Sequence, residues 1–153
     1  MRQGDVLLIH HKFDLLATLI RKITHSYWNH IAWAINSNEI IEAKGTGVTI
    51  SSKEKFKNKF LYDTKCIRLQ NLSKRQISKT TLNLKNLQCR YNYFYFIYSY
   101  FKILLKHKCE CRTCSNFIAN ELKRQNYYII KTNSKYIVPE DFNQHKFKKE
   151  VNF

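Results

Sequence analysis

Three cysteines stand close together at the start of the segment CECRTCSNFIANEL, residues 109–122. Cys109, Cys111 and Cys114 suit three chemistries: metal binding, disulfide formation and nucleophilic catalysis. Structural zinc usually takes four ligands from two spaced pairs, whereas here His107 would have to join the cysteines from one short segment. Disulfides between such close cysteines would be strained, and they would be labile in a reducing cell. Free cysteines are often simply small buried side chains, which is the alternative to all three.

Cys114 differs from the other two cysteines because a predicted helix begins at this residue. Residues 114–124 carry apolar side chains at helical spacing, and Thr113 or Ser115 can cap the start of the helix. A thiol at a helix N-terminus is favoured as the thiolate by the unpaired N–H groups and the helix dipole, which lower its pKa. The same N–H groups can donate to an oxyanion. Cys114 is therefore the candidate nucleophile, and it needs a general base.

His30 is the candidate base, because it opens HIAWAI (30–35), a segment that alternates with the period of a strand. The odd positions of this strand form an apolar face around Trp33. His30 shares the other face with Ala32 and Ala34, whose small side chains leave room for another element to bring in a thiol. The alternative is an ordinary surface histidine.

Glu42 lies on the next expected strand, within IIEA (40–43). A three-residue hairpin loop, either 36–38 or 37–39, places Glu42 beside His30 on the same face, whereas a two-residue loop places it on the opposite face. In the first case Glu42 accepts a hydrogen bond from one ring nitrogen of His30, and the other nitrogen deprotonates Cys114. That set of nucleophile, base and orienting group would support covalent catalysis.

The elements that must position these residues alternate between short strands and helices, which predicts the α+β class. Patterns of hydrophobicity and turn residues predict strands at 6–9, 30–35, 40–43, 48–50, 62–69 and 127–130 and helices at 13–23, 73–87, 91–105 and 114–124. The charged segment 53–59 is either helical or looped, and Pro139 opens a polar, basic tail. Without repeats or a low-complexity linker, residues 1–153 are expected to form a single domain.

The composition admits polyanionic partners. The chain has 153 residues, 44% of them hydrophobic, and a net charge of +16, so nucleic acid, an anionic membrane surface or an acidic substrate would be attracted. The lysines are spread along the chain, without an arginine cluster suited to phosphate. The first residues lack the apolar segment of a secretory signal, and the aromatic stretch 91–105 is shorter than the about 20 apolar residues that span a bilayer. A soluble, cytoplasmic protein with reduced thiols is expected.

Taken in chain order, several segments together resemble the circularly permuted NlpC-type papain-like hydrolases, the YiiX/YebB-like group. The segments are GDVLL (4–8), LIRKIT (19–24), SYWNHIAWAI (26–35), IIEAKGTGV (40–48), RYNYF (90–94), CSNFIANEL (114–122) and VPEDF (138–142). In this group the histidine and the carboxylate precede the cysteine. The resemblance implies a permuted papain-like fold, in which a small antiparallel sheet packs against helices and the nucleophile begins a helix. It makes Cys114 the nucleophile, His30 the base and Glu42 the polar third member, and Tyr91 lines the site.

The resemblance implies a thiol-dependent hydrolase or acyltransferase that acts on an amide or ester bond and uses neither a metal nor another cofactor. Its substrate would be a small molecule, a peptide, a cell-wall peptide or an acyl lipid, and the positive charge adds an anionic membrane surface as a partner. Cys109 and Cys111 beside the nucleophile depart from the family pattern, which leaves the substrate open. Two alternatives are a non-catalytic nucleic-acid-binding module that uses lysines and stacking tyrosines, and a degenerate hydrolase that serves as an interaction module.

Overall fold

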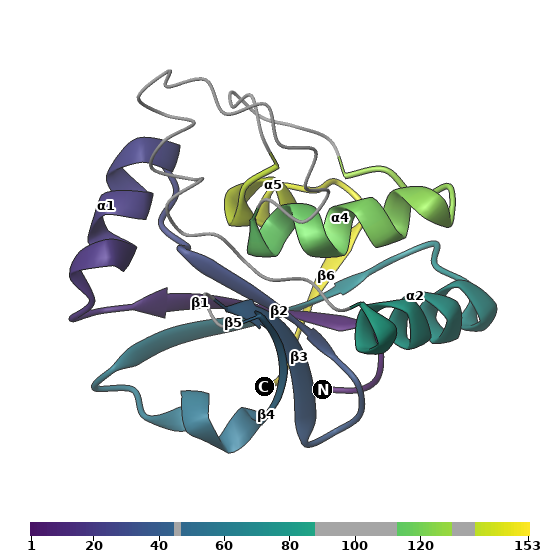
Figure 1. Ribbon diagram of the computed structural model, residues 1–153, viewed down its shortest axis with the longest axis horizontal. Helices are drawn as coiled ribbons and strands as arrows, with labels where there is room; N and C mark the ends of the chain where they lie inside the picture. The colour runs from purple at the N-terminus through teal and green to yellow at the C-terminus, as the bar shows by residue number, and fades with distance from the viewer. Residues whose placement is uncertain (45–46, 88–112, 130–136) are drawn as a thin grey trace.

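The centre of the fold is a six-stranded antiparallel sheet with the order β4-β3-β2-β1-β5-β6 (Figure 1). The computed structural model describes residues 1–44, 47–87, 113–129 and 137–153. The strands are β1 Asp5–His11, β2 His30–Ala34, β3 Glu39–Lys44, β4 Gly47–Ser52, β5 Tyr62–Leu69 and β6 Lys148–Val151. The helices are α1 Leu15–Thr24, α2 Lys74–Asn86, α4 Cys114–Arg124 and α5 Pro139–Asn143, with the 3-10 helix η1 at Lys53–Lys57. The expected α+β class is confirmed.

The β2–β3 hairpin has the three-residue loop that the site requires. The Ile35 N–H donates to the Glu39 carbonyl at 2.9 Å, which leaves residues 36–38 as the loop. Asn36 Oδ1 accepts hydrogen bonds from the N–H groups of Asn38 and Glu39, both at 2.8 Å, and so closes the turn. The resulting register sets Ala32 opposite Glu42. Glu42 therefore lies on the His30 face of the hairpin.

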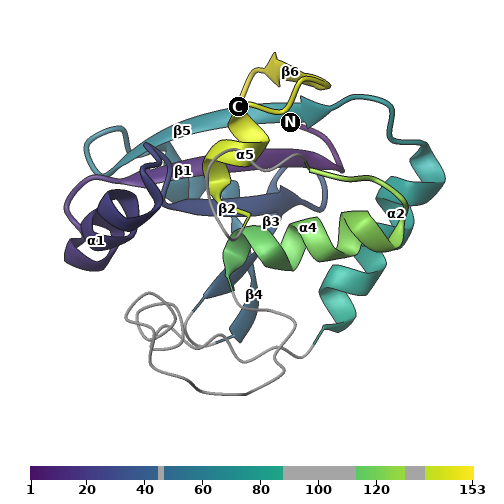
Figure 2. The ribbon, with the colours of Figure 1, turned by 90° about the horizontal axis from the view of Figure 1, so that it is seen from above.

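The two faces of the sheet are covered differently. The face that carries Trp33 packs against α2, α4 and α5 in the larger core (Figures 1 and 2). The opposite face carries Ala32, which packs with Phe56 of η1 in a smaller core. The expectation that the alanines make room for the helix with the thiol is therefore wrong. The large apolar side chains of α4 pack on the broad Trp33 face instead, and Cys114 meets His30 at the end of β2.

The C-terminal residues are not the expected polar tail. The helix α5 begins at Pro139, and Asp141 Oδ2 accepts a hydrogen bond from the Val138 N–H at 2.7 Å. The strand β6 then pairs with β5. The sequence hid both elements because α5 is too short to display a helical period and β6, KKEV, is an edge strand with a polar sequence.

Most of the other expected elements are present in the described part of the chain, with shifts of one or two residues at some ends. The charged segment 53–59 contains η1, and Ser73 caps α2 through a reciprocal capping box with Gln76. Residues 127–129 do not form the expected strand; the Tyr127 side chain is buried and its hydroxyl donates to the Gln70 carbonyl at 3.0 Å. Residue 130 and the expected helix 91–105 lie outside the described residues. No helix of the described part has the length and apolar content needed to cross a membrane.

Candidate active site

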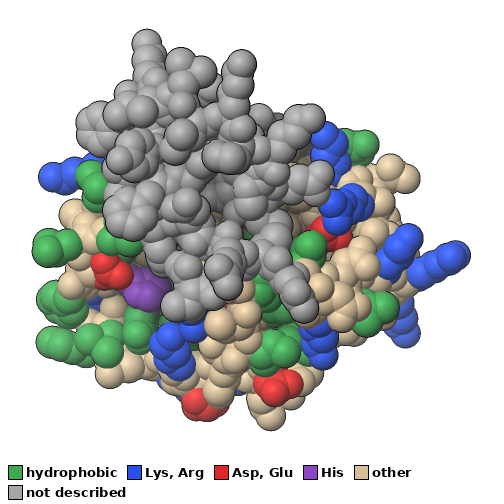
Figure 3. All heavy atoms as spheres, viewed as in Figure 1, with side chains coloured by type: hydrophobic (Ala, Val, Ile, Leu, Met, Phe, Trp, Pro, Cys, Tyr) green, Lys and Arg blue, Asp and Glu red, His purple; other side chains and the backbone are tan. Residues whose placement is uncertain are grey.

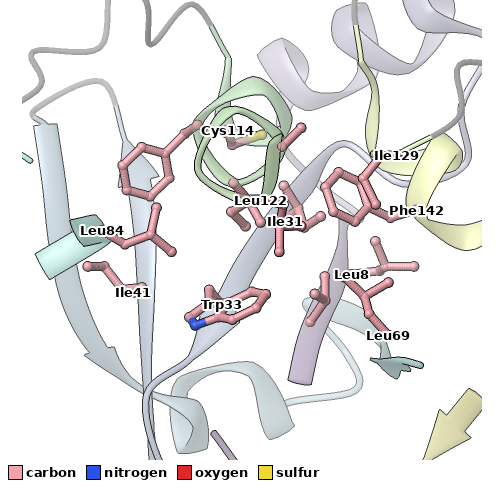
Figure 4. Close-up of a cluster of buried hydrophobic side chains, with 14 of the residues drawn as sticks. Leu8, Ile31, Trp33, Ile41, Leu69, Leu84, Cys114, Leu122, Ile129 and Phe142 are labelled. Atoms are coloured by element: carbon pink, nitrogen blue, oxygen red, sulfur yellow. The ribbon is translucent and has the colours of Figure 1, made fainter. Parts of the chain in front are cut away.

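The first turn of α4 fixes the position of Cys114. Thr113 Oγ1 accepts a hydrogen bond from the Asn116 N–H at 3.0 Å, so Thr113 is the cap and Cys114 the first residue of the helix. The apolar face of α4, which includes Leu122, packs over Ile31 and Trp33 (Figure 4). This packing holds the N-terminus of α4 over β2, and the Cys114 side chain is buried there.

His30 and Glu42 form a buried pair at the other side of the thiol. His30 Nε2 lies 2.8 Å from Glu42 Oε2, and the side chains are 13% and 1% exposed, respectively. Because the His30 side chain is mostly covered and is paired with Glu42, it is not the ordinary surface histidine of the alternative interpretation. Glu42 orients the ring through Nε2, which leaves Nδ1 as the nitrogen available to the thiol.

The electrostatics of Cys114 and His30 favour a thiolate paired with an imidazolium. Burial opposes the charge on His30, but a hydrogen bond to Cys114 and the negative charges of Cys114 and Glu42 outweigh it and raise the pKa of His30 to about 9. Burial likewise opposes the thiolate, but the hydrogen bond and positive charge of His30 outweigh it and lower the pKa of Cys114 from its ordinary value. Ser115 Oγ, 3.9 Å from the sulfur, adds to this stabilisation.

Lys44 completes the arrangement behind the carboxylate. Its Nζ lies 2.7 Å from Glu42 Oε1 in an ion pair that lacks hydrogen-bond alignment, and it donates to Ser51 Oγ at 3.2 Å. Burial would raise the pKa of Glu42, but the hydrogen bond and charge of His30, followed by Lys44, hold it at about 2. Lys44 was not predicted as a site residue, although its position two residues after Glu42 on one strand places both side chains on the same face.

A second histidine from β1 lies beside the site. The ring centroid of His11 is 6.0 Å from that of His30, and its backbone N–H donates to Asn29 Oδ1 at 2.8 Å. Burial, and then the positive charge of His30, lower the pKa of His11 to about 4, so this ring is neutral where His30 is charged. Its proximity depends on the pairing of β1 with β2, which the sequence pattern does not reveal.

Other candidate residues fall elsewhere. Tyr91, Cys109, Cys111 and His107 lie outside the described residues, so their expected roles stay predictions. Cys66 is buried in the smaller core, where burial raises its pKa to about 11 and makes its thiol unreactive. Across the described ranges, no three side chains of His, Cys, Asp or Glu gather as metal ligands would.

The arrangement contains the parts of a nucleophilic site: an ionisable thiol at a helix start, a histidine that can exchange its proton, and a buried carboxylate that orients the histidine. No protein-family model and no curated protein matches the sequence. Its function therefore has to be inferred from the chemistry of this site.

Proposed function

We propose that this protein is a cysteine hydrolase or acyltransferase that cleaves an amide or ester bond through Cys114, His30 and Glu42. The observation that carries the proposal is the chain of interactions from the buried thiol through the imidazole to the carboxylate. Each pKa shift has the sign that catalysis needs. The pKa of the thiol is lowered, the pKa of the histidine is raised, and the pKa of the carboxylate is lowered. A structural ion pair would not need a thiol at the start of a helix.

In the proposed acylation step, the Cys114 thiolate attacks the carbonyl carbon of the substrate and a C–S bond forms. The oxyanion that develops would accept hydrogen bonds from the N–H groups of Cys114 and Ser115, which helix geometry leaves without intrahelical partners. The Asn116 N–H is already used by the cap. As the tetrahedral intermediate collapses, the His30 imidazolium gives its proton to the leaving amine or alkoxide, and a thioester remains on Cys114.

In the second step, neutral His30 takes a proton from water or from another acceptor, which attacks the thioester and regenerates the thiolate. Glu42 keeps the ring oriented in both steps and stabilises the imidazolium. Lys44 holds the carboxylate through its other oxygen, Oε1. Water as the acceptor gives hydrolysis, and an alcohol or amine gives acyl transfer.

The fold proposal follows the same residues. We infer that the domain is a permuted papain-like fold, because the histidine and carboxylate strands precede the nucleophile helix in the chain and that helix packs on an antiparallel sheet. The resemblance of the sequence segments to the YiiX/YebB-like group supports the same order. The candidate substrates are peptides, cell-wall peptides, small molecules and acyl lipids.

Trapping the acyl-enzyme tests this proposal. The protein is mixed with p-nitrophenyl esters and activated amides, and each cysteine is then examined by peptide mass spectrometry. We expect a burst of p-nitrophenolate and an acyl group on Cys114, both absent in Cys114→Ala. The Cys66→Ala variant is the matched control, since it removes another buried thiol and should leave the burst unchanged.

The His30→Gln variant separates catalysis from simple thiol acylation. We expect it to remove the burst while Cys114 remains present. Acylation spread evenly over the cysteines, or an equal burst in His30→Gln, would contradict the proposal. Salt-dependent DNA binding that Cys114→Ala leaves unchanged, in a protein without a burst, would instead favour the nucleic-acid-binding module.

A further inference from the structure

An exposed apolar cluster lies outside both cores, at the end of the sheet where β1 leads into α1. We call it the apolar tip; its residues are Phe13 (69% exposed), Leu15 (89%), Leu19 (41%), Phe60 (72%) and Leu61 (39%). The rings of Phe13 and Phe60 contact each other, with centroids 5.1 Å apart, yet most of their surface faces solvent. Exposed clusters of large apolar side chains mark interaction sites.

The apolar tip is held in place by hydrogen bonds between its two loops. The Lys12 N–H donates to the Leu61 carbonyl at 3.0 Å, and Lys12 Nζ donates to the Lys59 carbonyl at 2.7 Å. The side chain of Asp14 caps α1 by accepting from the Ala17 N–H at 3.1 Å. The backbone that carries these side chains is therefore fixed by hydrogen bonds, and it holds the apolar side chains in their exposed positions.

Helix α1 extends the same surface. Ala17 is its only buried residue, although the helix is amphipathic. In Figures 1 and 2 α1 stands at the margin of the fold, apart from α2, α4 and α5. Hydrophobic side chains gather on the left of Figure 3, where α1 lies in Figure 1. The apolar row of the helix is thus not used to build the described core.

The charges around the apolar tip select an anionic partner. Three acidic residues lie near the tip in sequence: Asp63 pairs with Lys12 at 2.8 Å, Glu54 pairs with Lys57 at 2.7 Å, and Asp14 is used to cap α1. The exposed side chains of Lys22 and Lys59 form no ion pair among the residues that the structure describes. Apolar side chains flanked by lysines are typical of segments that insert at the surface of anionic bilayers. A second copy of a chain with a net charge of +16 would be repelled.

The apolar tip is also linked to the end of the sheet that carries the candidate active site. Arg21 of α1 donates from Nη1 to the His11 carbonyl at 2.7 Å. The His11 ring lies near His30, and the His11 N–H is bound by Asn29, the residue before His30. Docking through α1 would therefore fix the orientation of the candidate active site relative to that surface.

We propose that the apolar tip inserts into an anionic membrane surface and presents Cys114 to acyl lipids, whose ester or amide bond it cleaves or transfers. The proposed membrane binding is supported by the exposed apolar cluster and its lysines, and the proposed substrate class rests on the function proposed above. Phe13 and Phe60 enter the interfacial region, and Lys22 and Lys59 contact lipid phosphates.

Co-sedimentation with vesicles tests the docking. All proteins in this assay carry Cys114→Ala, so that lipid turnover cannot change the vesicles during the binding measurement. We expect binding to vesicles of phosphatidylcholine mixed with phosphatidylglycerol, weaker binding at high salt, and little binding to pure phosphatidylcholine. The double variant Phe13→Ser/Phe60→Ser should weaken binding more than tenfold. The matched control Tyr128→Ser/Phe147→Ser changes two exposed aromatic residues outside the apolar tip and should bind as before.

A second variant, Lys22→Glu/Lys59→Glu, tests the charge without touching the apolar side chains, and it should also weaken binding more than tenfold. Equal binding by the Phe13→Ser/Phe60→Ser variant and its control overturns the docking, because attraction would then come from net charge alone. The docking is also overturned if these variants lose binding to DNA but keep binding to vesicles. If vesicle binding behaves as expected but no acyl group is trapped on Cys114, the docking stands and the proposed function fails.

Discussion

Removing the thiol should change the titration of the histidine beside it. An increase of the His30 pKa from 6.5 to about 9 corresponds to ~3 kcal/mol of net preference for the imidazolium. Burial acts in the opposite direction, so the interactions with Cys114 and Glu42 together exceed this value. Cys114 contributes at least as much as Glu42. Its loss in Cys114→Ala should therefore lower the pKa of His30 by more than about one pH unit.

The assay is an NMR titration of the imidazole C–H signals, with His30 assigned by its absence from His30→Gln. Wild-type His30 should titrate near pH 9, and in Cys114→Ala it should titrate clearly lower. Cys66→Ala is the matched control, since that thiol lies in the smaller core. A wild-type His30 that titrates near 6.5, or one that still titrates near 9 in Cys114→Ala, would refute the ion pair.

Three further predictions concern Glu42, its lysine and the core. Glu42→Gln should slow acylation ~10²-fold. It should also move the alkaline limb of the pH–rate profile below pH 9, because the His30 imidazolium loses its anionic partner and deprotonates at lower pH; stopped-flow burst rates measure both effects. The depressed pKa of Glu42 contributes stability above about pH 4.5 that is lost as the pH falls towards 2. Lys44→Met should raise the pKa of Glu42 and so lower stability at pH 3 to 4 in urea unfolding, whereas Lys65→Met, whose partner Glu150 is exposed, should not. Leu122→Ala should cost ~2–5 kcal/mol of unfolding free energy at a fully buried site, and the exposed Leu82→Ala should change it by less than ~1 kcal/mol, measured by the same method.

The sequence was most informative about the bounds of regular elements. The strand expected at 62–69 is present with those ends, although both of its faces contribute to a core. The start of α4 was predictable because Thr113 can cap and the apolar spacing begins at Cys114. The edge strand β6 could not be found, since its position leaves it polar.

Only those parts of the site that depend on residues close together in the sequence could be predicted. Cys114 and Glu42 were found from a helix start and a hairpin loop, and the loop length decided between two faces. The face on which α4 packs was mispredicted, because it depends on tertiary fit between large side chains. His11 was missed for the same reason, since its approach to His30 depends on strand pairing distant in sequence. Lys44 needed only the alternation of one strand.

The most direct test of the central claim is the rate at which iodoacetamide alkylates each cysteine as a function of pH, read by peptide mass spectrometry. We expect Cys114 to react fastest, with a rate that rises at lower pH than that of an ordinary thiol of pKa about 8.5. In His30→Ala this rise should move to higher pH and the rate at neutral pH should fall. A Cys114 that reacts no faster than the buried Cys66, with a profile that His30→Ala leaves unchanged, would contradict the account.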